Sequence, residues 1–252
     1  ATLQGDYLLV IDRFNTGMLF MAVLTILIAR RVIPFFAGRM VPGLDIPMLV
    51  NSGRVQLAIG SLAIVAGLLK FSLVMAACLA VVGAIGLYQL VRWKPLNVLH
   101  KPMLWILYLG YLGLAAGLLA AAAHLSGLGG LYLARAAAHV HIIGMGGFAV
   151  LIIGMVTRTA LGHTGRPLAL DGSMLASYWL MVAAVLLRLI ALWPSTFSGT
   201  LLHAAATAWI ASLALYLFRY IPILTQPRAD AAPRAPAPAT QPPRPHAPAG
   251  SK

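Results

Sequence analysis

The sequence contains no glutamate, and its five acidic residues are all aspartates. None of those aspartates lies inside a long apolar run. A di-iron centre built from Glu-x-x-His pairs in a helical bundle is therefore excluded, and a transporter that passes protons along buried carboxylates is not expected. The single cysteine, Cys78, excludes both a disulfide within the chain and a thiolate metal cage.

Charged residues are scarce, and apolar residues take their place. Only 9% of the residues are charged and 61% are hydrophobic, and the mean hydropathy is +0.90. A soluble domain has about 25% charged and 45–50% apolar residues, so this chain has too little polar surface to cover a soluble core. No run shows the alternation of a barrel strand. We therefore predict an all-α integral membrane protein whose main partner is the lipid bilayer.

Seven apolar runs have the length that a bilayer-crossing helix requires, which is about 20 residues. Only Lys70 separates the second run from the third, so a tight hairpin is expected there. The seven runs predict one transmembrane domain over residues 1–224, built as a polytopic helical bundle. They cover residues 15–36, 54–69, 71–92, 103–123, 133–157, 174–193 and 198–221.

The basic residues orient this predicted bundle. Lysine and arginine number 18 and gather at alternate ends of the spans, which by the positive-inside rule places the amino terminus outside and the carboxyl terminus in the cytoplasm. Because they lie in short loops and in the tail, nucleic acid is not an expected partner. Residues 225–252 are rich in proline and alanine and predict a disordered cytoplasmic tail.

Histidine and arginine are the polar side chains left to carry chemistry near the spans. Ionisable residues in a membrane are costly and usually face the bundle interior, and imidazole is a common ligand of haem iron and of copper. We predict a cofactor or metal site there, although each histidine could instead serve only in capping or interhelical hydrogen bonds. The predicted topology places five such residues at a similar depth on the outer side: His124, His139, His141, Arg188 and His203.

The roles within this outer group follow from which helices carry the residues. A haem between two helices needs one imidazole from each, so His139 and His203 are the predicted axial pair. His124 is a further candidate metal ligand, and Arg188 is a candidate partner for a haem propionate. His141 cannot join His139 on one metal, because two residues along a helix are separated by about 200°.

The string TRTALGHTGRPL at residues 157–168 ends the fifth span. Its two glycines permit a sharp turn with exposed backbone amides, and its proline prevents further helix. The side chains of Arg158, His163 and Arg166 surround that turn and could bind an anion or a propionate. Alternatively, the arginines anchor the topology and the glycines only form a loop.

Glycines also recur on helix faces within the spans. Gly113 and Gly117 are four residues apart in the fourth run, and Gly144, Gly146 and Gly147 follow the histidines of the fifth. Small residues let membrane helices approach closely, so close packing is the first interpretation. Open space beside a flat cofactor is the other.

The sequence resembles the NnrS family of bacterial membrane proteins. The resemblance depends mainly on RAAAHVHIIGMGGFAVLIIGMVTRTALGHTGRPL at residues 135–168, where LGHTGRP at the end of a span is quite specific. Weaker support comes from RVIPFF at 31–36, from Arg188, and from AWIASLALYLFRYIPILTQPRAD at 208–230.

This resemblance implies an inner-membrane protein of the nitric-oxide and nitrosative-stress response that contains b-type haem and copper. His139, Arg158, His163 and Arg166 match the family motif. No turnover reaction is implied, so we favour a role other than that of an enzyme. The resemblance covers only the last part of a longer family pattern, which implies a partner: an amino-terminal half outside this sequence or further copies of the chain.

Two interpretations from other classes stay open at this point. The chain could be a metal-free transporter of a small molecule or anion that uses Arg158, Arg166 and Arg188 as substrate contacts. It could also be a non-catalytic half-module that packs against a partner and holds no cofactor alone.

Overall fold

The computed structural model describes residues 7–128, 130 and 136–229, and every regular element within them is helical. The predicted all-α class is confirmed. The part of the tail beyond residue 229 lies outside the described residues, so its disorder stays a prediction. In chain order the elements are α1 (Tyr7–Met40), α2 (Val50–Leu68), α3 (Ser72–Arg92), the short 3-10 helix η2 (Pro95–Val98), α4 (Pro102–Leu125), α6 (Ala136–His141), the π-helix η3 (Ile142–Ala149), α7 (Val150–His163), α8 (Gly172–Ala191) and α9 (Ser198–Thr225).

Six helical segments of the described chain are long and apolar enough to cross a membrane, where the sequence predicted seven. The remaining run, 54–69, does form a helix, α2. This helix begins earlier, at Val50, and the asparagine, serine, arginine and glutamine in its first two turns lower the mean hydropathy of the helix. The tight hairpin expected at Lys70 is present, since Lys70 takes a left-handed backbone (φ 65°) between α2 and α3. The six segments are Val10–Met40, Ser72–Arg92, Pro102–Leu125, Ala137–His163, Gly172–Ala191 and Ser198–Thr225.

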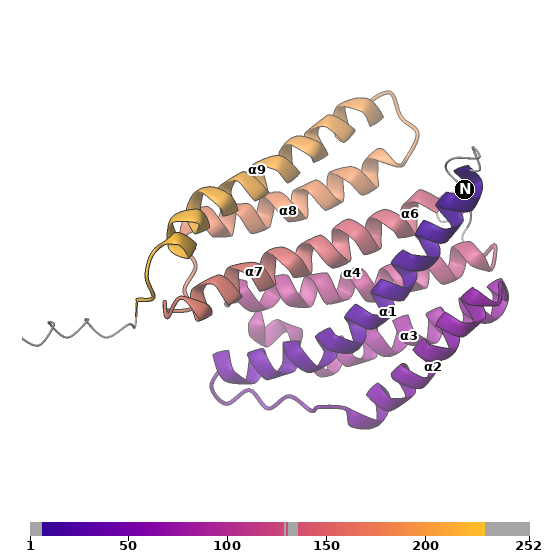
Figure 1. The fold of residues 1–252 in the computed structure, drawn as a ribbon, viewed down its shortest axis with the longest axis horizontal. Helices are drawn as coiled ribbons and strands as arrows, with labels where there is room; N and C mark the ends of the chain where they lie inside the picture. The colour runs from indigo at the N-terminus through magenta and orange to yellow at the C-terminus, as the bar shows by residue number, and fades with distance from the viewer. Residues whose placement is uncertain (1–6, 129, 131–135, 230–252) are drawn as a thin grey trace, which may run out of the picture.

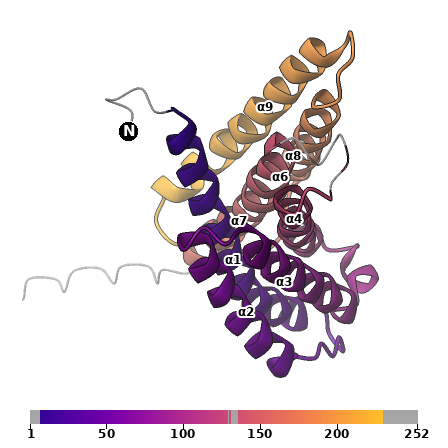
Figure 2. The same ribbon diagram turned by 90° about the vertical axis from the view of Figure 1, so that its right-hand side faces the viewer.

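Successive long helices run antiparallel and lie side by side (Figure 1). The hairpin of α2 and α3 forms one edge of the bundle and the hairpin of α8 and α9 forms the other, with α4 and the continuous segment α6–η3–α7 between them (Figures 1 and 2). The amino-terminal end of α1 lies at the same end of the bundle as the start of α6 (Figure 1). Which end faces the cytoplasm stays a prediction.

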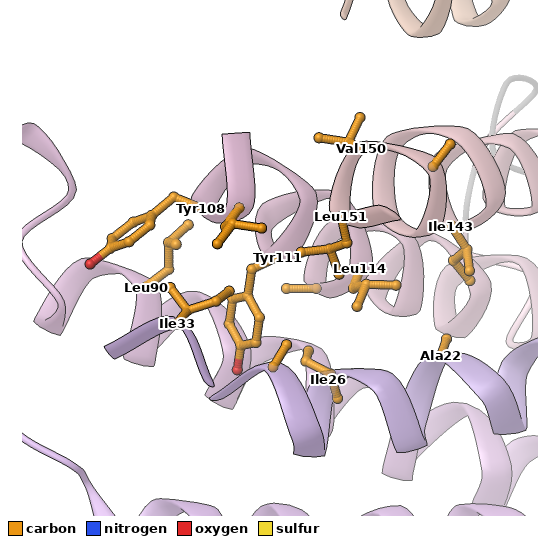
Figure 3. Packing of buried hydrophobic residues seen from close by; sticks show 14 of the residues in the cluster. Ala22, Ile26, Ile33, Leu90, Tyr108, Tyr111, Leu114, Ile143, Val150 and Leu151 are labelled. Carbon is orange, nitrogen blue, oxygen red and sulfur yellow. The ribbon is translucent and has the colours of Figure 1, made fainter. Parts of the chain in front are cut away.

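Helix α4 is the centre of the core. Buried residues make up 67% of its most apolar stretch, compared with 17% for α9, because α4 packs against α3, α1, η3 and α7 while α9 packs mainly on α8. Tyr111 and Leu114 of α4 meet Ile26 of α1 and Ile143 of η3 in one apolar cluster (Figure 3). The contact between α4 and the segment α6–η3–α7 positions the site described below.

Asp171 fixes the start of α8, and its replacement gives a first test of the fold. Its carboxylate accepts a hydrogen bond from the Met174 amide at 3.0 Å and one from the Ser173 hydroxyl at 2.7 Å, and it pairs with Arg219 of α9 at 2.5 Å. Partial burial raises the pKa of Asp171, but these bonds and Arg219 outweigh it and leave the pKa below the ordinary 3.8.

Because the folded pKa is lowered, this stabilisation is complete above the unfolded pKa and is lost as the pH falls through the folded value. We expect Asp171→Ala to cost about 1 kcal/mol through the lost cap, and the exposed ion pair to add well under 1 kcal/mol. Asp171→Asn keeps an oxygen that can accept the capping hydrogen bond, so it should lose only the smaller contribution of the ion pair with Arg219. Thermal unfolding in detergent at neutral and acidic pH measures both, and equal losses in the two variants would contradict the capping role.

Candidate functional site

Two histidines from neighbouring helices meet near one end of the bundle. His124 closes α4, and His139 lies in α6, where its side chain is only 3% exposed. Their ring centroids are 5.0 Å apart, with the ring planes inclined by 34°. The Nδ1 atoms of both rings are buried and have no hydrogen-bond partner among the described residues. Buried polar atoms normally have a hydrogen-bond partner. Two unpartnered nitrogens side by side are therefore candidates for binding a ligand that the protein alone does not supply.

Both imidazoles line one cavity of about 170 Å³ between α1, α2, α3, α4 and α6. The ion pair between Lys70 and Asp12 lies at its exposed side, since these side chains are 64% and 55% exposed. Asn15, Thr16 and Ser72 add neutral oxygens, and the thioether of Met75 and two leucines add apolar surface. The cavity therefore passes from an exposed, oxygen-rich side to a buried side with nitrogen and sulfur atoms. Its lining is formed by Asp12, Asn15, Thr16, Leu19, Gly67, Lys70, Ser72, Met75, His124, Leu125 and His139.

The structure does not bring His203, the predicted partner of His139, to this cavity. His203 is exposed on α9, and the main contacts of α9 are with α8 and α7 rather than with α6. The partner that His139 does contact is His124. Arg188 of α8 is half-buried, and it does not line the cavity. The nearby His141 bonds to its own helix instead, where its Nδ1–H donates to the Ala137 carbonyl at 2.7 Å.

Arg158 lies within α7 and faces α1 instead of the histidines. Its side chain is 8% exposed, and its guanidinium carbon is 3.7 Å from the centroid of the Phe36 ring. Nη1 donates to the Met40 thioether at 2.7 Å. Because α1 supplies all of these contacts, Arg158 ties the end of α1 to α7.

The LGHTGRP turn closes α7 with its own backbone. Gly165 has a left-handed φ of 67°, and the amides of residues 164–166 donate to carbonyls of the last turn of the helix, with Arg166 reaching Leu161 at 3.0 Å. This is the glycine-based C-cap of a helix. The amides that could have cradled an anion are therefore already used, and the His163 side chain is exposed.

Arg166 attaches this turn to the end of α9. Its Nη1 donates to the Ile223 carbonyl at 3.2 Å, and its Nη2 donates to the Gln226 side chain at 2.9 Å. The last residue described, Ala229, donates its amide to the Thr164 carbonyl at 2.9 Å. The arginines of the motif thus hold helix ends together, and they do not converge with Arg188 on one substrate site.

A second polar cluster, which was not predicted from the sequence, is buried among α1, α2, α3 and α4. Gln56 and Gln89 are 0% and 1% exposed. The Tyr111 hydroxyl donates to Gln89 at 2.5 Å, and Gln89 donates to Ser52 at 3.0 Å. Arg30, only 9% exposed, lies in the same layer, and its Nε has no partner among the described residues. The signal that could have found the cluster is a glutamine inside each of two adjacent apolar runs.

The separation of the two histidine rings is compatible with a single metal ion. A bound metal lies about 2 Å from an imidazole nitrogen, so two rings on one tetrahedral ion have centroids about 5 Å apart, which is the separation found here. Haem fits less well, because pockets for ligands of that size hold roughly 300–1,000 Å³. No group of three or more histidine, cysteine, aspartate or glutamate side chains within the described part of the chain could hold a metal, so a third ligand would have to be of another kind.

Comparison with known proteins decides the family. A family model described as NnrS protein matches residues 2–228, which include every helix described above. The chain belongs to the NnrS family. This confirms the resemblance inferred from LGHTGRP, and the match extends over all the apolar runs. No curated protein and no solved structure matches the chain. The six apolar segments make this NnrS chain a multi-pass membrane protein.

Proposed function

We propose that this NnrS chain is a metal-binding protein of the bacterial inner membrane that holds copper between His124 and His139 and acts in the nitric-oxide and nitrosative-stress response. The observation that carries the metal site is the pair of buried, unpartnered Nδ1 atoms on two imidazoles that line one cavity. Family membership supports the wider role. A copper ion held there would offer an open coordination position to nitric oxide.

The surroundings of the pair favour this role. Nitric oxide is small and uncharged, so it can reach the buried end of the cavity without the desolvation cost that a charged reactant would meet there. The protein's part is to present two neutral imidazoles at a fixed separation and to keep bulk water from the buried end of the cavity. Haem is the second cofactor that we propose, at a place other than this cavity.

Copper binding is tested by purifying the chain in mild detergent, without a polyhistidine tag, followed by metal analysis. We expect close to one copper ion per chain, and loss of it in His139→Ala and in His124→Ala because each variant removes half of the imidazole pair. His100→Ala is the matched control, since it removes an exposed histidine that lies outside the cavity and is not a candidate ligand. Folded wild-type protein without copper after reconstitution would overturn the metal site.

Visible spectra of the same samples, oxidised and dithionite-reduced, test the haem proposal. A Soret band with reduced b-type bands supports haem, and its loss in His203→Ala with copper retained would separate the two sites. Metal-free and colourless protein would favour the metal-free transporter or the half-module. A transporter that depends on Arg158, Arg166 and Arg188 would need three residues that here lie in three separate surroundings.

The link to nitric oxide is tested on the copper-loaded, reduced protein. We expect added nitric oxide to change its spectrum, and we expect His139→Ala to abolish that change. Cells that carry His139→Ala should then be more sensitive to nitric oxide than cells that carry the control His100→Ala. Equal sensitivity, with both variants expressed to the same level, would argue against the physiological role while leaving the metal site intact.

A further inference from the structure

The cavity beside the two histidines contains a third side chain with ligand chemistry. Met75 of α3 lines the same cavity as His124 and His139 and is only 5% exposed. Its thioether is a soft donor that was not among the candidate ligands from the sequence, because methionine in an apolar helix usually serves packing alone.

The neighbouring helix leaves room for the Met75 sulfur. A Cβ atom built on Gly67 of α2 would lie 3.0 Å from the Met75 Sδ and 3.3 Å from its Cε, so any side chain there would press on the thioether. The same Cβ would approach the Phe20 ring of α1 to 3.3 Å. Helix α2 therefore packs closely on the thioether of α3, at the wall of the cavity that the imidazoles also line.

We propose that Met75 is the third ligand of a site for a monovalent soft cation, Cu(I), formed with His124 and His139. This rests on the proposed function, because it takes the histidine pair as the metal centre. Thioether and imidazole donors suit Cu(I), whereas carboxylate, carbonyl and water suit harder ions.

The charge of the site selects for the monovalent state. The three donors are neutral, and the carboxylate on the lining, Asp12, is paired with Lys70 at the exposed side. A divalent ion would keep its whole charge in apolar surroundings. Since the cost of desolvating an ion grows with the square of its charge, a monovalent ion occupies the buried end at a far smaller desolvation cost.

The lining also gives the cation a route. The oxygen donors Asp12, Asn15, Thr16 and Ser72 are at least partly exposed, whereas Met75 and His139 are buried. A hydrated ion can therefore exchange water for oxygen ligands at the exposed side before it reaches the nitrogen and sulfur atoms. Lys70 competes for the Asp12 carboxylate, which disfavours a cation that stays at the oxygen-rich side.

The test is X-ray absorption at the copper edge of the reduced, copper-loaded protein. We expect sulfur as well as nitrogen in the first coordination shell, and loss of the sulfur signal in Met75→Leu. That variant keeps the side-chain volume, so the fold should be retained. Its Cu(I) affinity, measured by competition with a chromogenic chelator, should fall by at least about 10-fold, since losing even an outer-shell partner of a ligand typically costs that much, and Ag(I) should behave in the same way.

Met181→Leu is the matched control, because Met181 is 1% exposed on α8 and lies outside the cavity. It should leave both the sulfur signal and the affinity unchanged. Met75→His should keep a metal but shift the preference toward Zn(II). Copper bound by the histidines with no sulfur in its shell, and unchanged affinity in Met75→Leu, would overturn the role of Met75 while the proposed function stands. Absence of copper from the wild type would overturn both.

Discussion

Alanine at Gly113 is expected to prevent the chain from forming a stable bundle. A Cβ atom there would lie 2.1 Å from the carbonyl oxygen of Gly146, 2.3 Å from its carbonyl carbon and 2.7 Å from the amide nitrogen of Gly147. These are backbone atoms of η3, so no side-chain rotation can relieve the overlap. Helices α4 and α6–η3–α7 would have to separate along the contact at the centre of the core.

The size of this effect follows from the kind of atoms involved. Overpacking in a close-packed interior typically costs about 1–3 kcal/mol and more where the backbone must shift, so we expect Gly113→Ala to lose at least about 3 kcal/mol. The measurement is the yield of monodisperse protein in detergent, together with its thermal unfolding.

Gly144→Ala provides the control within the same run of glycines. Nothing lies within 4 Å of a Cβ built there, and alanine favours the helical backbone over glycine by roughly 1 kcal/mol. We therefore expect Gly144→Ala to be neutral or slightly stabilising. Similar stability of the two variants would contradict the close approach of α4 and η3.

The same substitution tests how the metal site depends on the fold. His124 lies on α4 beyond Gly113, and His139 lies on α6 just before η3, so the approach of these two helices sets the 5.0 Å between the rings. Any Gly113→Ala protein that survives purification should bind copper more weakly than Gly144→Ala. This links the packing prediction to the proposed function.

These glycines show what the sequence could predict about the fold. Close packing and open space beside a cofactor were both compatible with the sequence; the structure confirms close packing for some of these glycines, and a cofactor beside the others stays a prediction. Gly113, Gly117 and Gly147 allow close contact, whereas Gly144 faces open space. The π-helix η3 was not predicted, because the hydropathy of an apolar run is the same for an α- or a π-turn. Which face meets a neighbour depends on the partner helix, and one sequence does not specify it.

The candidate site was predicted in part. Hydropathy and topology placed His124 and His139 near one depth, and the structure brings them into contact. The pairing of His139 with His203 used depth alone, and depth does not say which helices are neighbours. Helix α9 packs at the edge of the bundle on α8, so His203 is left exposed. Nothing in the sequence marks Met75 as a ligand, because methionine is common in apolar helices. Only its place in the lining of the cavity identifies it.

Arg30 is a third residue whose surroundings the sequence does not reveal, and its contact with Gly53 carries a second large prediction. A Cβ on Gly53 would lie 1.8 Å from the Arg30 Nη1 and 2.0 Å from its guanidinium carbon. The guanidinium thus lies directly against the backbone of α2. Among the described residues, the aspartates in ion pairs bind Lys70 and Arg219, so no carboxylate there neutralises Arg30.

We expect Gly53→Leu to destabilise the protein by about 2–4 kcal/mol, since it overpacks the contact and forces a charged group from its place between helices. The guanidinium is the end of a flexible side chain, but Arg30 is only 9% exposed, so moving it exposes an unpaired charge to lipid. Gly38→Ala is the control, because nothing lies within 4 Å of a Cβ on Gly38.

The decisive measurement is a double-mutant cycle. Removing the guanidinium with Arg30→Ala frees the space that leucine needs, so Gly53→Leu should cost much less in that background, with a coupling energy of about 1–3 kcal/mol. Arg30→Met alone should be neutral or stabilising, because replacing a buried charge by an apolar group of similar volume often is. Thermal unfolding of the wild type, the two single variants and the double variant in one detergent gives the coupling. If Gly53→Leu costs as much in the Arg30→Ala background as in the wild type, the leucine clashes with something other than the guanidinium, and the contact between α1 and α2 is not built around this charge.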